Sequence, residues 1–119
     1  MASLASPQPH GAWAWIWQRI TAVLLVIFLG AHLFVLHYVP ENLSINFLGV
    51  AARFKSVLYV IVDSGLLAVG LYHALNGIRN VLFDFVVAEG KRTAITWTLI
   101  VVGLAFLGWG AYALTAFMK

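Results

Sequence analysis

Three long apolar segments, separated by short polar ones, make up most of this sequence. Between Ile20 and Val39 no residue carries a permanent charge. Twenty helical residues at about 1.5 Å each span about 30 Å, the thickness of the hydrocarbon core of a bilayer. Two further apolar runs of similar length follow, and no strand-like alternation is present. The pattern predicts an all-α integral membrane protein with transmembrane helices at about residues 14–39, 56–83 and 93–117.

Polar and turn-forming residues set the boundaries of these helices. Residues 1–12 are small, polar and interrupted by prolines, which predicts a flexible tail before a single three-helix domain at 13–119. Pro40 ends the first helix. A connecting loop follows, with a short interfacial helix expected at about 45–54. A second loop is expected at 84–92, which contains a Glu-Gly-Lys-Arg turn.

Composition supports the membrane class and excludes several others. The chain has 119 residues, of which 63% are hydrophobic and 9% charged, whereas a soluble domain has about 25% charged residues. It has no cysteine, which excludes a disulfide framework and any thiolate-held zinc or iron–sulfur site within the chain. The net charge of +3 comes from scattered basic residues, so no block for binding nucleic acid is present.

The basic residues divide slightly unequally between the two sides of the membrane. On the N-terminal side lie Arg19, Arg79, Lys91 and Arg92, and on the other side Arg53, Lys55 and Lys119. Because cytoplasmic loops carry the excess of Lys and Arg, this division favours a cytoplasmic N-terminus.

Two histidines lie at different depths in the predicted helices. His32 is seven residues before Val39, about 10 Å inside the outer boundary, and His73 is seventeen residues after Ser56, about 25 Å from it. Two imidazoles on one metal must each lie about 2 Å from it. His32 and His73 should therefore not bind the same iron. Either each has a partner ligand on another chain, or only one of them is a ligand.

Haem is the cofactor that best suits a buried imidazole in this chain. It needs one histidine per chain and an apolar slot, whereas zinc needs several converging ligands. His73 is the stronger ligand candidate; for His32, a ligand and a packed neutral side chain are equal alternatives. His37 lies near the helix end and is expected at the interface. Arg19 and Arg79 are candidates for the haem propionates, or for lipid headgroups.

At this point the sequence resembles a known family. The series His73, Gly77, Arg79 and Asp84, together with Trp17–Ala22 at the start of the first helix, is similar to the small hydrophobic membrane-anchor subunit of succinate dehydrogenase, of cytochrome b type. The resemblance covers about residues 13–117.

The resemblance implies a function that this chain cannot perform alone. Such anchors bind haem b, one or two per complex, between themselves and a second three-helix subunit. They dock an iron–sulfur subunit and a flavoprotein, and electrons from succinate reach quinone in the membrane. By resemblance, His73 is a haem ligand, and His32 matches the first-helix histidine of two-haem members. The expected location is the bacterial or archaeal cytoplasmic (inner) membrane.

The quinone site is implied less directly. Asp84 would lie near it, and Gln18 and Arg19 are weaker candidates for the same pocket. Phe85 stands where better-known members have tyrosine, so the position and the type of quinone stay open. Asp63, an unusual acid in an apolar run, is given no role.

Alternatives remain at this stage. The same chain would serve fumarate reductase, because the direction of reaction is set by potentials and by quinone. A haem-free structural anchor would leave His73 hydrogen-bonded between helices. A proton-relaying transporter subunit using Asp63 and the histidines is disfavoured, because the sequence has no inverted repeat.

Overall fold

The protein consists of long helices joined by short connections. The computed structural model describes residues 10–38 and 46–118. In chain order the elements are α1 (His10–Tyr38), α2 (Phe47–Arg53), α3 (Val57–Phe85) and α4 (Glu89–Phe117). The described residues contain no strand, so the prediction of an all-α fold is confirmed.

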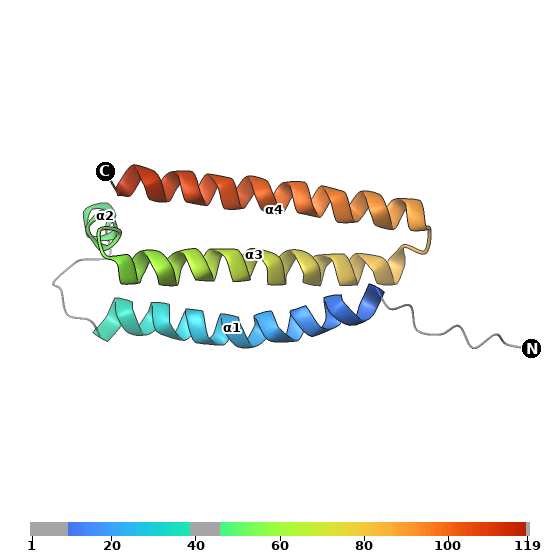
Figure 1. Ribbon diagram of the computed structural model, residues 1–119, viewed down its shortest axis with the longest axis horizontal. Coiled ribbons are helices and arrows are strands. Elements are labelled where there is room, and N and C mark those ends of the chain that lie inside the picture. Colours follow the sequence, from blue (N-terminus) through green and yellow to red (C-terminus); the bar gives the residue numbers. More distant parts are fainter. Residues whose placement is uncertain (1–9, 39–45, 119) are drawn as a thin grey trace, which may run out of the picture.

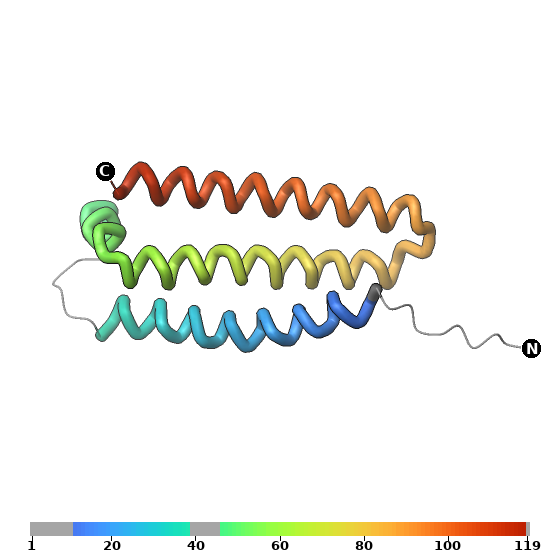
Figure 2. The backbone as a smooth tube through the Cα atoms, viewed as in Figure 1, coloured from blue at the N-terminus to red at the C-terminus, as the bar shows by residue number. Residues whose placement is uncertain are grey.

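The three long helices lie antiparallel in a single row, with α3 in the middle (Figure 1). α3 packs against α1 on one side and against α4 on the other. The tube in Figure 2 shows the same order, with α2 at the end where α1 finishes and α3 begins. Because only α3 has two long neighbours, its side chains form both interhelical interfaces.

Each long helix is long and apolar enough to cross a membrane. The candidate spans are Gly11–Tyr38, Val57–Phe85 and Glu89–Phe117. Twenty-nine helical residues measure about 43 Å, more than the hydrocarbon core of about 30 Å, so the ends reach the headgroup layers. The prediction of three transmembrane helices is confirmed.

The helix boundaries differ from the predicted ones at two places. α1 begins at His10, so the last residues of the predicted tail are helical, while residues 1–9 and Pro40 lie outside the described residues. α4 begins at Glu89, which shortens the predicted second loop to residues 86–88. Arg92 explains the tight turn, because its guanidinium donates to the carbonyls of Val86 at 2.6 Å and Phe83 at 2.9 Å, groups that the end of α3 leaves unpaired.

The short helix predicted at about 45–54 is present as α2. Asn46 caps its first turn by accepting a hydrogen bond from the backbone of Gly49 at 2.9 Å. Phe47 and Phe54 lie against Phe117 at the end of α4. These ring contacts hold α2 across one end of the helix row.

Most of the apolar surface is left uncovered within this chain. Among the described residues the buried apolar side chains are Val35 of α1 and Tyr59 and Val62 of α3, and α4 has no buried residue. In water such a surface would be unstable, but lipid tails or neighbouring subunits cover it in a membrane.

Candidate functional site

The first candidate site is a polar cluster around His73, between α1 and α3. Thr21 Oγ1 lies 3.1 Å from His73 Nδ1, and Gln18 Nε2 lies 3.4 Å from His73 Nε2. The Gln18 amide also donates to the His73 carbonyl at 3.2 Å. Asn76 donates to Gln18 Oε1 at 2.7 Å and to the carbonyl of Ala14 at 3.1 Å. Each of these four polar side chains therefore has a partner.

The donor count in this cluster assigns the tautomer of His73. The single hydroxyl proton of Thr21 is donated to the Trp17 carbonyl at 2.7 Å. Toward His73, Thr21 must therefore accept, which places the ring proton on Nδ1. The unprotonated nitrogen of His73 is then Nε2. Its lone pair meets one group, the Gln18 amide nitrogen, at 3.4 Å.

Gly77 provides the space for this arrangement. A Cβ atom at this position would lie 3.3 Å from Gln18 Nε2, closer than an ordinary contact. One turn after His73, glycine therefore lets the Gln18 amide reach across to α3.

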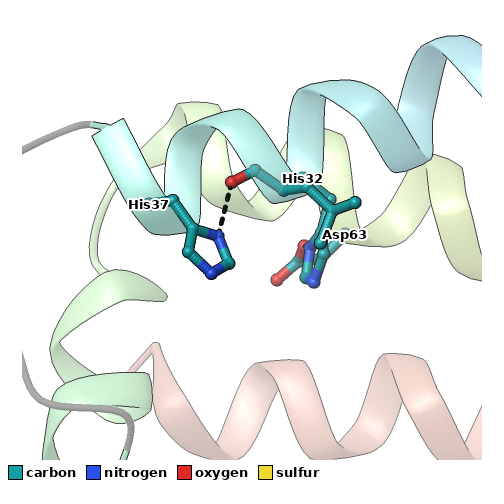
Figure 3. A network of polar contacts seen from close by, with 4 residues as sticks. His32, His37 and Asp63 are labelled. Atoms are coloured by element: carbon teal, nitrogen blue, oxygen red, sulfur yellow. Dashed lines mark hydrogen bonds and ion pairs between the residues drawn. The ribbon is translucent and has the colours of Figure 1, made fainter.

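The second candidate site pairs His32 on α1 with Asp63 on α3. His32 Nδ1 lies 2.7 Å from Asp63 Oδ1, and both side chains are about three-quarters covered, being 30% and 26% exposed. Figure 3 shows the two side chains side by side. His32 Nε2 has no hydrogen-bond partner among the described residues.

The two sites lie at well separated depths. Thr21 and His32 are eleven residues apart on α1, and Asp63 and His73 are ten apart on α3. Both intervals correspond to about 15 Å along a helix. The geometry thus agrees with the sequence-based separation, and a single iron cannot contact both imidazoles.

Two of the other sequence-predicted residues occupy different surroundings. Arg19 is exposed and its guanidinium lies over the Trp15 ring, 4.4 Å from the centroid. Arg79 lies over Phe83 at 4.4 Å and donates to Thr96 of α4 at 3.1 Å. Arg19 thus contacts its own helix α1, whereas Arg79 links α3 to α4.

Asp84 lies apart from the His73 cluster. It is exposed near the end of α3, about 16 Å along the helix from His73. Phe85 beside it is 82% exposed. Of the three residues predicted near quinone, only Gln18 contacts His73. At the opposite end of α1, His37 is exposed and bonds its own helix at the Leu33 carbonyl, 2.9 Å away (Figure 3).

Three site residues were missed by sequence reasoning. Asn76 follows His73 by three residues, a spacing that puts both on one face of α3. Thr21 follows Gln18 by the same spacing on α1. Asp63 lies seven residues after Ser56, just as His32 lies seven before Val39, so equal depth was the signal that would have paired Asp63 with His32.

A groove of about 370 Å³ runs between α3 and α4. Its lining is almost entirely apolar. Within it, Leu75 of α3 lies so close to Gly103 of α4 that a Cβ at Gly103 would overlap the leucine. The few polar groups, from Asn76, Arg79 and Thr96, gather at one end. The groove lies beside the His73 cluster and shares Asn76 with it.

The donor set decides which cofactor suits these sites. The described residues contain no group of three or more His, Cys, Asp or Glu side chains that could hold a metal ion, so a metal bound by this chain alone has no cage. A cofactor that takes one imidazole nitrogen per site fits better. At both sites Nδ1 is bonded to an acceptor, which orients the ring and leaves Nε2 as the nitrogen that could bind a cofactor.

The fold and these sites define a class of protein: a three-helix membrane subunit with half-buried histidines at two depths. A family model described as succinate dehydrogenase/fumarate reductase transmembrane subunit matches residues 2–111. The chain belongs to this family, and it is a membrane-anchor subunit of succinate dehydrogenase type.

Curated relatives agree with this assignment. The chain is 33% identical over 102 residues to succinate dehydrogenase 2 membrane subunit SdhC of Mycobacterium tuberculosis, covering 82% of this chain and 69% of that protein. It is 28% identical over 95 residues to a succinate dehydrogenase hydrophobic membrane anchor subunit of Halobacterium salinarum, covering 79% and 73%. A protein of the same description from Archaeoglobus fulgidus is 27% identical over 101 residues, covering 85% and 86%.

Proposed function

We propose that this subunit holds haem b through His73 and helps to pass electrons to quinone. The observation that carries the proposal is the fixed tautomer of His73, whose Nδ1–H is bonded to Thr21 and whose Nε2 lone pair meets only the 3.4 Å contact with the Gln18 amide, which iron would replace. Such a hydrogen bond behind a ligating histidine sets its orientation and raises its basicity. When bound, haem b supplies one-electron transfer at a potential tuned by its axial ligands.

His32 provides the equivalent atom for a second haem nearer the other face. Its Nδ1 is bonded to Asp63, and its depth differs from that of His73 by about 15 Å. Since each site offers one imidazole from this chain, a second membrane subunit would supply the other residue that holds each haem. Arg79, which lies near the end of α3, is suited to a propionate that reaches the headgroup layer.

Quinone is reduced at the end of the bundle that carries Asp84. Gln18 is already bonded to His73 and Asn76, so its role is to support the histidine. Asp84 and Arg19 are exposed: Arg19 would donate to a quinone carbonyl, and Asp84 would accept from a quinol hydroxyl. Asp84→Asn is expected to raise the quinone KM while leaving the haem spectrum unchanged.

The same end of the bundle faces the soluble subunits. The iron–sulfur subunit and the flavoprotein dock there, in the cytoplasm, on the side of the bacterial or archaeal membrane where Arg19, Arg79, Lys91 and Arg92 lie. This orientation follows the distribution of basic residues.

The haem proposal is tested by spectroscopy of the purified complex. The reduced-minus-oxidised spectrum should show a low-spin b haem with two histidine ligands. His73→Ala should remove one haem, because no other group at that depth in the described chain supplies an imidazole. His37→Ala is the matched control and should remove none, since His37 is exposed and bonded to its own helix. An intact wild-type complex without haem absorbance would refute the proposal.

A further inference from the structure

The two histidines differ in the acceptor that their Nδ1–H meets. Behind His73 is a neutral hydroxyl, at 3.1 Å, whose own proton goes to a backbone carbonyl. Behind His32 is a carboxylate, Asp63, at the shorter distance of 2.7 Å. Charge-assisted hydrogen bonds are roughly twice as strong as neutral ones. The Nδ1–H of His73 is thus bonded to a neutral acceptor, and that of His32 to a charged one.

We propose that Asp63 is a positioning residue that orients His32 to bind iron. Its charge makes His32 the histidine that donates more electron density to the iron it binds. The proposal rests on the function proposed above, because it concerns a haem held by His32.

Burial gives the proposal its first support. Asp63 lies within an apolar helix, where an acid is costly without a partner and is retained for a function or a specific pairing. Its partner is His32 alone among the described residues, through Oδ1. Because an ionised carboxylate accepts hydrogen bonds and cannot donate them, the proton of His32 sits on Nδ1.

The free atom of His32 gives the second support. His32 Nε2 has no hydrogen-bond partner among the described residues, although the ring is held by Asp63. A ring fixed on one side and open on the other is suited to a ligand that arrives from outside the chain.

The negative charge of Asp63 has a predictable effect on potential. A carboxylate bonded to the ligand favours the more positive, oxidised form of the iron. The haem at His32 should therefore be harder to reduce than it would be with a neutral acceptor. No comparable charge lies behind His73, so the effect is specific to one of the two depths.

The test uses the purified complex with all its subunits, and it follows haem content and midpoint potential. Asp63→Asn keeps the shape and an acceptor oxygen but removes the charge. It should retain the His32-dependent haem and raise its ratio of reduced to oxidised form about tenfold at a fixed ambient potential, equivalent to about 59 mV for one electron. Asp63→Leu also removes the acceptor and should lower the affinity for this haem by about 10–100-fold.

Two controls separate this effect from general damage. His32→Ala identifies which haem depends on His32. Asp84→Asn, the same change at the other acid of α3, lies about 30 Å from Asp63 along the helix and should leave the potential of that haem unchanged. In all Asp63 variants the His73-dependent haem should keep its content and potential.

The outcomes distinguish the two proposals. If His32→Ala removes no haem, the role of Asp63 is refuted while the haem at His73 stands. If Asp63→Asn and Asp63→Leu change neither haem content nor potential, the pair is only a contact between helices. If His73→Ala removes no haem either, the proposed function itself fails.

Discussion

At the scale of single residues, the orientation of each buried histidine depends on what accepts its ring proton. Thr21 can accept from His73 only because its own proton is already donated to Trp17. Toward His73, the Thr21 hydroxyl can therefore only accept a hydrogen bond. A serine would do the same, while an isosteric valine would not.

Thr21→Val is therefore expected to weaken haem binding at His73. Loss of an acceptor behind a ligating histidine costs about 10–100-fold in affinity, which is measured by haem content per complex and by reconstitution with added haem. Thr21→Ser is the matched control and should behave as wild type. Equal haem affinity in the valine and serine variants would show that the hydroxyl has no part in holding the ring.

Residue-scale predictability was uneven for a physical reason. His73 was predictable because an imidazole in an apolar run is costly, and its motif continued to Gly77. Asn76 and Thr21 were not singled out, since small polar residues occur in many membrane helices and only their position against His73 gives them meaning. Asp63 was seen but left unpaired, because its partner lies on another helix, thirty-one residues away.

At the scale of helices, α1 and α3 approach closely where a glycine faces an aromatic ring. Gly65 of α3 lies directly under the Phe28 ring of α1, and a Cβ at Gly65 would overlap that ring. Small residues at such crossings allow close packing in lipid, where dispersion and polar contacts drive association. Gly65 lies on α3 between Asp63 and His73. Its packing therefore affects the distance between α1 and α3 at both histidine sites.

Gly65→Ala is expected to destabilise the α1–α3 pair by about 1–3 kcal/mol, the usual cost of overpacking. The measurement is the thermal midpoint of the purified complex, which should fall. Gly30→Ala provides the comparison, since a Cβ there meets no atom within 4 Å, and its midpoint should match wild type. The same decrease in both variants would contradict the assigned contact.

Helix positions were predictable to within a few residues, and the exceptions have local causes. Hydropathy placed the start of the third helix at about residue 93, because Glu89, Lys91 and Arg92 are polar and Gly90 favours a turn. The structure begins α4 at Glu89. Arg92 pairs with the last carbonyls of α3, a tertiary contact that hydropathy does not contain.

At the scale of the whole molecule, a single row of three helices leaves two broad faces open. With so few buried side chains, the described part of this chain has no core that would hold a flat cofactor by itself. Under the proposed function a second membrane subunit would complete each haem site, and the orientation of the row would decide which ends meet the soluble subunits.

That orientation is tested with single cysteines, which the chain otherwise lacks. In intact cells, a membrane-impermeant maleimide should label Lys55→Cys but not Lys91→Cys. Lys91→Cys should become reactive only after permeabilisation, because one span separates it from Lys55 and the proposed orientation puts the side with more basic residues in the cytoplasm. The reverse labelling would invert the proposed topology, and equal labelling of both would contradict three spans.

The unequal distribution of polar contacts among the helices also bears on the order of membrane insertion. The threonines of α4 bond carbonyls of their own helix, as Thr98 does with Ala94 at 2.8 Å. In contrast, Gln18, Asn76 and Asp63 find partners only across the α1–α3 interface. Polar groups in lipid are costly until they are paired. We therefore expect α1 to stay beside the translocon until α3 has been synthesised and can pair with it. Because the threonines of α4 are bonded within their own helix, α4 can then enter the bilayer without a partner helix.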